Sequence, residues 1–345
     1  MTTAAPPLRG ALIGCGFVSR FHLEAWPRIA DARLVAICDV NPERLDQAGR
    51  NLPDVRRYTD PAALFEQEAE LDFVEICTQA DSHLELVELA ARRGVHILCQ
   101  KPAALVRADL RAMIDACVGT GVRLMIHENW RFRPWYRAMR AEIDAGSIGR
   151  PVRLRIAHRD TRALRPDGFE SQPYQATASR LILMDMGCHL IDTARYLIGE
   201  IQTVSATIGH FGRRNAGEDL AMLSVYFAGG ALGFFDMSWC AIPDFARPEW
   251  ALNETVAEGM EGTLRLLTDG SLELVTPTGD RERRTVPLPS DDEVYVDGYA
   301  ATQRHFIQGL LSGEEHETRA SDNLRTMEVV WAAYRSAEEG KPIAV

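Results

Sequence analysis

A short glycine-rich turn near the start of the chain constrains its fold more than any other feature. The turn reads Gly14-Cys15-Gly16-Phe17-Val18-Ser19 and directly follows the apolar pair Leu12-Ile13. Gly14 permits a tight turn at the end of a strand, and Gly16 has no side chain to keep a phosphate away from the backbone. Ser19 stands where a third glycine or alanine lets the next helix pack closely on the strand. This order is typical of a dinucleotide-binding fold, whose helix N-terminus binds the phosphates.

An acidic residue follows this turn at the distance that such a fold requires. Asp39 stands at the carboxyl end of a second apolar run, Leu34–Cys38. Its carboxylate can accept both hydroxyls of an adenine ribose, whereas a 2′-phosphate would meet a negative charge. We therefore expect NAD as the cofactor in preference to NADP. The alternative, a glycine-rich turn without a cofactor, is disfavoured because a strand and a helix flank it.

Length and composition place the chain among globular proteins with two domains. Its 345 residues suffice for two hydrophobic cores, and its net charge of −11 disfavours nucleic acid as a partner. No apolar stretch reaches the roughly 20 residues of a membrane span, and Met1–Pro7 lacks the pattern of a secretory signal. The seven cysteines are scattered and form no C-x-x-C pair, which predicts reduced thiols, a cytoplasmic location and no metal site.

Strands and helices alternate in the first part of the chain, which predicts an α/β domain with a parallel sheet, a Rossmann fold, over residues 1–130. The expected strands are Gly10–Ile13, Leu34–Cys38, Phe73–Ile76, His96–Cys99 and Arg123–Ile126, and the expected helices are Ser19–Trp26, Pro42–Asn51, Pro61–Glu68, Ser82–Arg93 and Ala108–Thr120. Parallel strands collect ligands at their carboxyl ends, so Thr78 and Gln79 are expected beside the cofactor. Asp81 or Ser82 is expected to cap the following helix, which Gly94 ends.

The pattern changes after Trp130 and predicts an α+β domain over residues 131–345, with a large, mostly antiparallel open sheet. The expected strands are Arg153–Arg159, Thr203–Ile208, Met222–Phe227, Ala231–Ser238, Thr263–Leu267 and Leu272–Val275, and the expected helices are Met186–Leu197, Val296–Leu311 and Ser321–Glu339. Gly229-Gly230 and Asp269-Gly270 are expected to form the turns of two hairpins. We expect the last helix to pack back on the first domain, and Phe245–Asn253 to form an irregular loop over a site.

A lysine follows the fourth expected strand, in the run Cys99-Gln100-Lys101-Pro102. Lys101 is therefore expected near the nicotinamide end of the cofactor site, where it can hydrogen-bond a substrate hydroxyl. Pro102 fixes the direction of the chain there, for instance through a cis peptide bond. The alternative for Lys101 is an ordinary surface lysine.

A histidine lies between two aspartates in a later helical segment. Asp185 and His189 are four residues apart, and His189 and Asp192 are three apart. If the helix begins near Asp185, all three share one face, and a histidine flanked by carboxylates is oriented as a base. The alternative is a helix cap at Asp185 with a packed histidine.

A third segment, Asn129-Trp130-Arg131-Phe132-Arg133-Pro134-Trp135-Tyr136, lies at the expected domain junction. It combines aromatic rings with cations, and Arg131 is the best candidate in it for a cofactor or substrate contact. The alternative is an interdomain connection with an aromatic core.

Together these segments resemble the Gfo/Idh/MocA family of sugar and polyol oxidoreductases over nearly the whole chain. The resemblance rests on the Gly14–Ser19 turn, Asp39, Cys99-Gln100-Lys101-Pro102, Asn129 with Arg131, and Gly187-x-His189-x-x-Asp192. Two positions beside the expected nicotinamide depart from the family pattern. Gln100 replaces the usual glutamate, and Gln79-Ala80 replaces a common Thr-Pro-Pro run.

The resemblance implies three catalytic residues, Lys101, Asp185 and His189. It implies that His189 removes the proton of a substrate hydroxyl, that Asp185 orients it, and that Lys101 polarises the same oxygen while hydride passes to NAD. Asp160 ends a stretch that resembles an inositol dehydrogenase segment lining the sugar pocket. The implied cofactor contacts are Gly14, Cys15, Gly16, Phe17, Val18, Asp39, Thr78, Gln79, His83, Gln100, Lys101, Trp130 and Arg131. The implied substrate contacts are Lys101, Asp160, Asp185, His189, Asp192 and Trp239.

The acidic groups of this set suit a neutral polyhydroxylated substrate better than a sugar phosphate. The arginines between Arg153 and Arg165 argue the other way, unless they cover an exposed or interface face of the sheet. The combination of Cys99-Gln100-Lys101-Pro102 with His127-Glu128-Asn129-Trp130-Arg131-Phe132 resembles the D-apiose dehydrogenase branch, which implies oxidation of an aldose at C1 to a lactone. The alternatives are an inositol or other polyol dehydrogenase and a non-catalytic NAD-binding sensor. The family resemblance also implies a homodimer or homotetramer that pairs through the open sheet.

Overall fold

The computed structural model describes residues 6–50, 52–243 and 252–345. The chain divides into two compact units, of which the first contains Met1–Asn129 and Val296–Leu324. The second contains Trp130–Tyr295 and Arg325–Val345. The helix α10 (Ala320–Glu339) therefore begins in the first unit and ends in the second.

The first unit contains the expected parallel α/β sheet. Its six strands lie in the order β3-β2-β1-β4-β5-β6, and every neighbouring pair is parallel. Their bounds are β1 Leu8–Ile13, β2 Ala32–Cys38, β3 Arg56–Tyr58, β4 Phe73–Ile76, β5 His96–Gln100 and β6 Leu124–His127. The strand order reverses between β1 and β4, where a sheet of this kind opens a crevice for its ligand. The short edge strand β3 was not expected from the sequence.

The helices of the first unit begin with or without a polar side-chain cap. They are α1 Ser19–Ala25, α2 Pro42–Gly49, α3 Pro61–Gln67, α4 His83–Arg92, α5 Arg107–Cys117 and most of α9 Val294–Ser312, with the short turns η1 Trp26–Arg28 and η2 Ala80–Ser82. The Asn41 and Asp60 side chains each accept two backbone N–H groups at the starts of α2 and α3. Gly94, which adopts a positive φ of 71°, follows α4 as expected. Ser82 precedes α4 without a side-chain cap hydrogen bond, and its hydroxyl lies 2.8 Å from the Thr78 Oγ1 and 2.9 Å from the Gln79 carbonyl.

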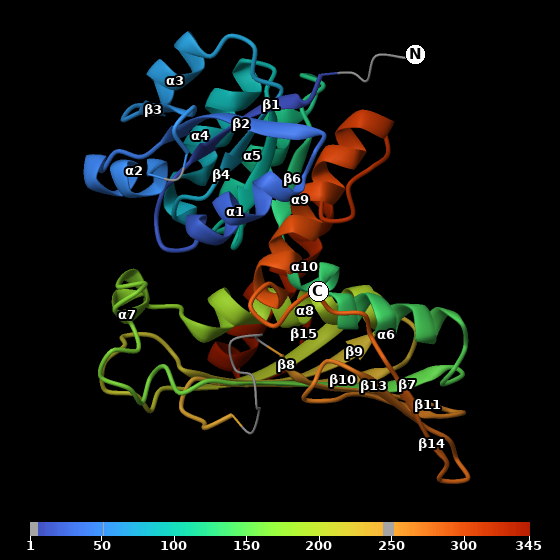
Figure 1. The fold of residues 1–345 in the computed structure, drawn as a ribbon. Coiled ribbons are helices and arrows are strands. Elements are labelled where there is room, and N and C mark those ends of the chain that lie inside the picture. The colour runs from blue at the N-terminus through green and yellow to red at the C-terminus, as the bar shows by residue number, and fades with distance from the viewer. Residues whose placement is uncertain (1–5, 51, 244–251) are drawn as a thin grey trace, which may run out of the picture. The chain divides into compact units, whose positions relative to one another are not determined.

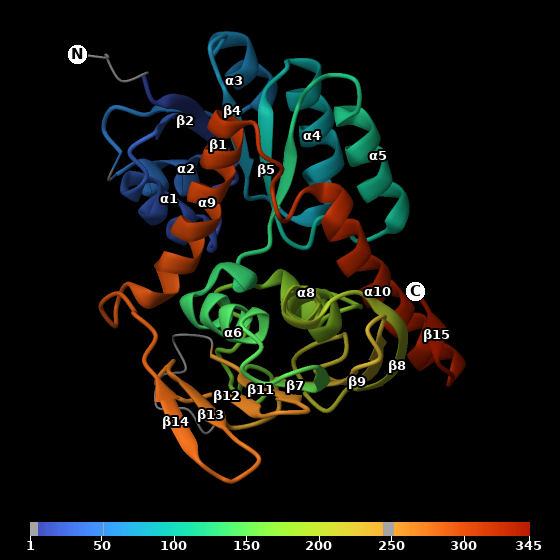
Figure 2. The same cartoon turned by 90° about the vertical axis from the view of Figure 1, so that its right-hand side faces the viewer.

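The core of the first unit forms on both faces of its sheet. Figure 2 shows α4 and α5 on one face and α1 and α9 on the other. On the second face the Phe73 ring lies 4.8 Å from the Trp26 ring and 5.9 Å from the Phe306 ring. Gly10 leaves room for Phe73, since a Cβ there would lie 2.0 Å from the Phe73 ring. This packing joins the 296–324 segment to residues near the start of the chain.

The second unit contains a mixed sheet of nine strands in the order β14-β13-β12-β11-β7-β10-β9-β8-β15. Their bounds are β7 Pro151–Arg159, β8 Ile201–Gly209, β9 Leu220–Phe227, β10 Leu232–Ser238, β11 Glu254–Gly259, β12 Thr263–Leu266, β13 Leu272–Val275, β14 Arg281–Arg284 and β15 Ile343–Ala344. Only the central pair β7 and β10 is parallel among these neighbours. The expected mostly antiparallel sheet and its two hairpins are confirmed, whereas the edge strands β14 and β15 and the inner strand β11 were not expected.

Helices lie on one face of this sheet. In both views α6 (Pro134–Asp144) and α8 (Cys188–Ile198) lie on the same side of the strands (Figures 1 and 2). Alternate residues of β9 and β10 are buried, and the residues between them are exposed. The exposed residues include Met222, Tyr226, Leu232 and Phe234. The opposite face of β9 and β10 therefore carries large apolar side chains in contact with solvent.

The expected helix Met186–Leu197 begins earlier than its periodicity indicates. The segment Leu183–Gly187 forms a π-helical turn, and α8 continues from it as an α-helix. The buried Glu218 carboxylate supports this start, because it accepts the backbone N–H groups of Leu181 and Leu183 at 3.0 and 3.2 Å. The Tyr334 hydroxyl of α10 donates to the same oxygen at 2.6 Å. Burial and the Glu218 charge raise the pKa of Tyr334 far above its ordinary value, so the hydroxyl remains a donor.

Several further features of the structure bear on the sequence analysis. The helix α6 and the four-residue helix α7 (Tyr174–Thr177) were not expected. The Phe245–Asn253 loop lies outside the described residues except for its last two positions. The seven cysteines, all within the described ranges, are free thiols, and six of them are buried. Among the described residues no helix combines the length and the apolar character that a membrane crossing requires.

We predict that Tyr334→Phe destabilises the second unit, because it removes one donor from the buried Glu218 carboxylate. The free energy of unfolding should fall by about 1.5–3 kcal/mol, the range for a hydrogen bond to a charged group. Urea unfolding of both proteins measures this change. Tyr226→Phe, on the exposed face of β9, is the matched control and should change stability by less than about 0.5 kcal/mol. Equal losses in the two variants would contradict the role given to Glu218.

Candidate active site

The glycine-rich turn has the backbone that its sequence predicts. Gly14 adopts a φ of +98°, and a Cβ there would lie 2.7 Å from the backbone of both Cys77 and Thr78. A Cβ on Gly16 would meet nothing within 4 Å. The close approach of β4 therefore requires Gly14, whereas Gly16 faces open space that a pyrophosphate can enter.

The residues around this turn hold it in place. The Asp39 carboxylate accepts the Cys15 N–H at 2.6 Å and the Asn41 N–H at 2.8 Å. The Ser19 hydroxyl, almost fully buried, donates to the Gly16 carbonyl at 2.7 Å. Burial, followed by the Asp39 charge, raises the pKa of Cys15 to about 12, so this residue is a neutral thiol. Asp39 thus has a second task besides the expected contact with ribose hydroxyls.

No side chain caps the N-terminus of α1, which follows the turn. Its backbone N–H groups and the helix dipole are therefore suited to an anion such as a pyrophosphate. With the open space at Gly16 and the carboxylate of Asp39, this makes a cradle that fits a dinucleotide. Phe17, half-exposed, and Val18 lie at the same turn.

The ends of β4 and β5 bring the next group of expected residues together. The His83 ring is buried, and its nitrogens lie 3.1 Å from the Thr78 carbonyl and 3.0 Å from the Ala103 carbonyl. This ring therefore connects the loops after the two strands, and burial lowers the pKa of His83. Gln79 is exposed beside Thr78. His83 positions the loops through backbone contacts, and this geometry does not support its expected direct contact with the cofactor.

Lys101 lies just after β5, and its peptide bond to Pro102 is cis. The Lys101 residue is partly exposed, whereas Gln100 is buried and accepts the Lys101 N–H at 2.7 Å. The Gln100 side chain thus turns into the first unit.

In the second unit, Asp185 begins a chain of polar contacts. Its Oδ2 accepts the Gln175 Nε2 at 2.9 Å, and the Gln175 Oε1 accepts the Arg162 Nη1 at 2.9 Å. Arg162 also lies 3.6 Å from the Asp160 carboxylate. This chain connects two expected substrate residues, Asp160 and Asp185, through a glutamine and an arginine between them.

His189 lies against an aromatic ring. The Trp130 indole, in the turn η3 (Trp130–Phe132), stacks on the His189 imidazole with centroids 4.5 Å apart and planes 4° apart. Both side chains are buried. The stack fixes the plane of the imidazole.

Asp192 forms a buried ion pair. Its carboxylate accepts the Arg131 Nε at 2.8 Å and the Arg131 Nη2 at 2.6 Å, with the Thr326 hydroxyl at 3.3 Å. The Asp192 side chain is fully buried, and that of Arg131 is 7% exposed. The pair holds η3 against α8, one residue away from the Trp130–His189 stack.

Trp239 is also fully buried. The Arg162 guanidinium lies 4.7 Å above its ring, and Trp239 therefore supports the polar chain from beneath. His158, on β7, contacts the Asn253 Oδ1 through its Nδ1 at 2.9 Å. Burial lowers the pKa of His158, and its ring lies 6.0 Å from Trp130.

Sequence reasoning missed two members of this site. Arg162 was assigned with its neighbours to an exposed or interface face, but it lies in the polar chain at Asp160 and Asp185. Gln175 was not considered, because it stands on a four-residue helix without a recognisable pattern. Only the contact with Asp185 identifies it.

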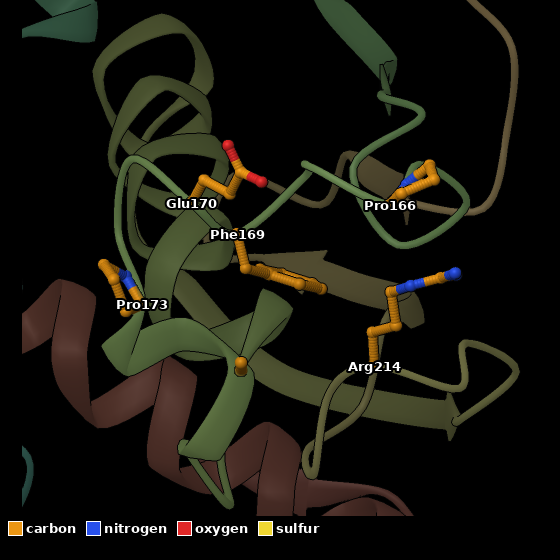
Figure 3. A pocket seen from close by; sticks show the side chains of 6 residues that line it. Pro166, Phe169, Glu170, Pro173 and Arg214 are labelled. Carbon is orange, nitrogen blue, oxygen red and sulfur yellow. The ribbon is translucent and has the colours of Figure 1, made fainter.

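A surface cavity of about 450 Å³ lies close to this region in the second unit. It is lined by Pro166, Phe169, Glu170, Pro173, Ala176 and Arg214. Figure 3 shows the Phe169 ring extending from its loop toward Pro166 and Arg214. The Phe169 ring lies 6.2 Å from Trp239, but none of the expected site residues lines the cavity.

Comparisons with known proteins identify the family of both parts of the chain. Residues 8–128 match the oxidoreductase family with an NAD-binding Rossmann fold, and residues 136–265 match the GFO/IDH/MocA C-terminal domain. A D-apiose dehydrogenase from Paraburkholderia graminis is 40% identical over 99% of this chain and 91% of its own length. A myo-inositol 2-dehydrogenase from Thermotoga maritima is 30% identical over 97% of this chain and 98% of its own length.

A solved structure is similarly close. An oxidoreductase from Agrobacterium radiobacter, in complex with NAD+, L-tartaric acid and magnesium, is 34% identical with a TM-score of 0.90. The match covers 98% of each chain. The chain therefore belongs to the Gfo/Idh/MocA family of oxidoreductases and is an NAD-binding enzyme, as its glycine-rich turn and Asp39 predict.

Proposed function

We propose that this enzyme oxidises a hydroxyl of a neutral sugar, and that the preferred reaction converts an aldose at C1 to a lactone. The observation that carries the proposal is the partly exposed polar chain Asp160–Arg162–Gln175–Asp185, which leads into the helical segment of His189. The P. graminis relative is a D-apiose dehydrogenase, which supports an aldose as the substrate.

The residues divide the chemistry between them. His189 takes the proton of the reacting hydroxyl, and the Trp130 indole stabilises the imidazolium that results. Asp185, oriented by Gln175, holds the substrate, and Lys101 donates to the reacting oxygen and stabilises its developing negative charge. Bound NAD would supply the acceptor for the hydride that leaves the carbon bearing the reacting oxygen.

The charges of the second unit favour a neutral substrate. Asp160 and Asp185 are hydrogen-bond acceptors that suit sugar hydroxyls, and the charge of Arg162 is shared with the Asp160 carboxylate. A sugar phosphate would require an arginine or lysine side chain that is not already paired with a carboxylate. Arg162 does not meet that requirement.

The second candidate is oxidation of a ring carbon in an inositol or another polyol. The 30% identity with the T. maritima myo-inositol 2-dehydrogenase favours it. The same donors and acceptors suit both substrate classes, so the carbon that is oxidised distinguishes them. A non-catalytic NAD-binding sensor agrees less well with a stacked histidine and a lysine in the two half-sites.

We predict that the purified protein reduces NAD with aldoses and forms lactones. The measurement is NADH absorbance over a panel of aldoses, sugar phosphates and inositols, followed by identification of the product. D-Apiose and related neutral aldoses should give the largest kcat/KM. Activity on inositols alone would contradict C1 oxidation and support the second candidate.

We predict that His189→Ala lowers kcat by about 10²–10⁴, the usual contribution of a general base. The affinity for NAD, measured by titration calorimetry, should stay within about twofold, because only the second unit is changed. His210→Ala, an exposed histidine of the same unit, is the control and should leave both values unchanged. Equal kcat in wild-type protein and His189→Ala would remove His189 from the mechanism.

We also propose that two copies pair through the open face of the second unit's sheet. Met222, Tyr226, Leu232 and Phe234 are 38–59% exposed on the face of β9 and β10 that α6 and α8 do not cover. Apolar side chains grouped on one sheet face are typical of an interface between subunits.

We predict that Phe234→Glu converts the assembled protein to a monomer, because a charge on this face opposes its burial. Light scattering after gel filtration measures the mass. Phe211→Glu changes an exposed phenylalanine outside the two strands and should leave the assembly intact. A monomeric wild-type protein would contradict the proposed pairing.

A further inference from the structure

A buried chain of hydrogen bonds runs from the Lys101 backbone into the core of the first unit. The Gln100 Oε1 accepts the Lys101 N–H at 2.7 Å, and the Gln100 Nε2 lies 2.6 Å from the His22 Nε2. The His22 Nδ1 then lies 2.7 Å from the Glu75 Oε1. His22 and Glu75 are completely buried, and Gln100 is 5% exposed.

The first member of this chain fixes the direction of all the others. A backbone N–H only donates, so the Gln100 oxygen must face Lys101 and the Gln100 amide nitrogen must face His22. The His22 Nε2 is therefore the acceptor, and its Nδ1 carries the hydrogen that it donates to Glu75. The ring is thus held as one neutral tautomer by hydrogen bonds at both of its ends.

Glu75 anchors the far end of the chain. Its Oε2 accepts the Trp26 Nε1 at 2.6 Å and the Gln303 Nε2 at 3.1 Å. Burial alone raises the pKa of Glu75, but the hydrogen bonds that it accepts from His22 and Trp26 help to lower the pKa overall. The anchor is therefore a carboxylate with donors from three other segments of the first unit.

A metal ion is the other arrangement that these side chains suggest. His22, Glu75 and His127 offer ligand atoms that lie within 4.8 Å of one another. However, the 2.7 Å between His22 and Glu75 is a hydrogen-bond distance, and the His22 Nε2 already accepts from Gln100. We therefore assign a proton, not an ion, to this contact.

We propose that Gln100 is a positioning residue, and that the Glu75–His22–Gln100 chain fixes the Lys101 backbone so that the Lys101 amine points at the reacting oxygen. The inference rests on the role of Lys101 in the proposed function. Only two of the 38 basic residues in the chain are lysines, Lys101 and Lys341. Lys341 lies in the second unit and pairs with Glu339 on the surface.

The hydrogen bonds of this chain determine which residues can replace Gln100. A glutamate has the same shape and still accepts the Lys101 N–H, but it has no hydrogen to give to His22. His22 can then take up a proton at Nε2 and donate to both carboxylates, which leaves the total charge unchanged. A leucine offers neither contact, so it frees the Lys101 N–H and leaves His22 and Glu75 in an incomplete chain.

The first experiment uses nuclear magnetic resonance of protein labelled at lysine, without cofactor or substrate. The spectrum contains one side-chain signal from Lys101 and one from Lys341, which serves as an internal control. In Q100L the Lys101 signal should shift or broaden while the Lys341 signal stays in place. Q100E and the control Q67L, at an exposed glutamine of α3, should keep the wild-type Lys101 signal.

The second experiment observes the His22 ring in protein labelled at histidine. The wild-type ring should be protonated at Nδ1 alone, and the ring in Q100E should be protonated at both nitrogens. Wild-type protein with the hydrogen on Nε2, or Q100E with the wild-type tautomer, would overturn the proposed direction of the chain. Urea unfolding of each variant shows which proteins are folded, and the wild-type and Q100E spectra decide the question even if Q100L does not fold.

The third experiment measures kcat and KM with NAD and the best sugar. Q100L should lose about tenfold to a hundredfold in kcat, as expected when a reacting group is displaced by about 1 Å. NAD affinity should stay within about twofold, and Q100E should recover most of kcat. An unchanged kcat in Q100L, or equal losses in Q100L and Q100E, would overturn the proposal.

These results separate failure of the inference from failure of the proposed function. If Lys101 does not act on the substrate, Q100L disturbs the Lys101 signal and kcat is unaffected by Lys101→Met. If the chain does not position Lys101, Lys101→Met abolishes activity while Q100L leaves both the signal and kcat unchanged.

Discussion

A carboxylate that is buried away from water must find its hydrogen-bond donors within the protein, and this constraint organises both units. In the first unit Glu75 takes donors from α1, η1 and α9, so it joins the 296–324 segment to the start of the chain. In the second unit Glu218 takes donors from the start of the π-helical turn and from α10. Each of these carboxylates supports one candidate catalytic segment, the Lys101 loop in one unit and the Asp185 turn in the other. Removing either would leave donors unpaired as well as a cavity.

The helical segment of the second unit assigns separate tasks to three residues that its spacing seems to group together on one face. Asp185 lies in a π-helical turn and reaches Gln175, His189 stacks on Trp130, and Asp192 pairs with Arg131. The Arg131–Asp192 pair holds η3 against α8, and the adjacent Trp130 then holds the His189 ring. A buried ion pair of this kind contributes little net stability, but it specifies one arrangement. Because the Arg131–Asp192 pair lies beside the Trp130–His189 stack, its main consequence is the orientation of the histidine ring.

Much of the first unit and part of the site follow from patterns that act locally. Gly14, Gly16 and Asp39 were identified because a tight turn, a close backbone approach and a carboxylate at a strand end each leave a mark on the sequence. Strands β4 and β5 were predicted within one residue because buried parallel strands are continuous apolar runs. The helix α6 has apolar residues at helical spacing, and it was missed because its start was interpreted as an interdomain connection. Strand β11 was missed because its buried residues are consecutive and do not alternate. Gln175 and Arg162 were missed because their task depends on Asp185, which lies on another element.

The sequence by itself determined the Rossmann fold, the NAD cofactor and the family, since these depend on motifs whose residues lie close together in the sequence. It also placed Lys101, Asp185 and His189 among the candidates. Only the tertiary structure showed that Asp192 pairs with Arg131 and that Trp239 lies under the Arg162 guanidinium, because burial and pairing partners are set by segments far apart along the chain. The same holds for the glycine-rich turn, where Asp39 also braces the Cys15 N–H. A contact of this kind depends on which strand ends meet at one edge of the sheet, and no local pattern records that.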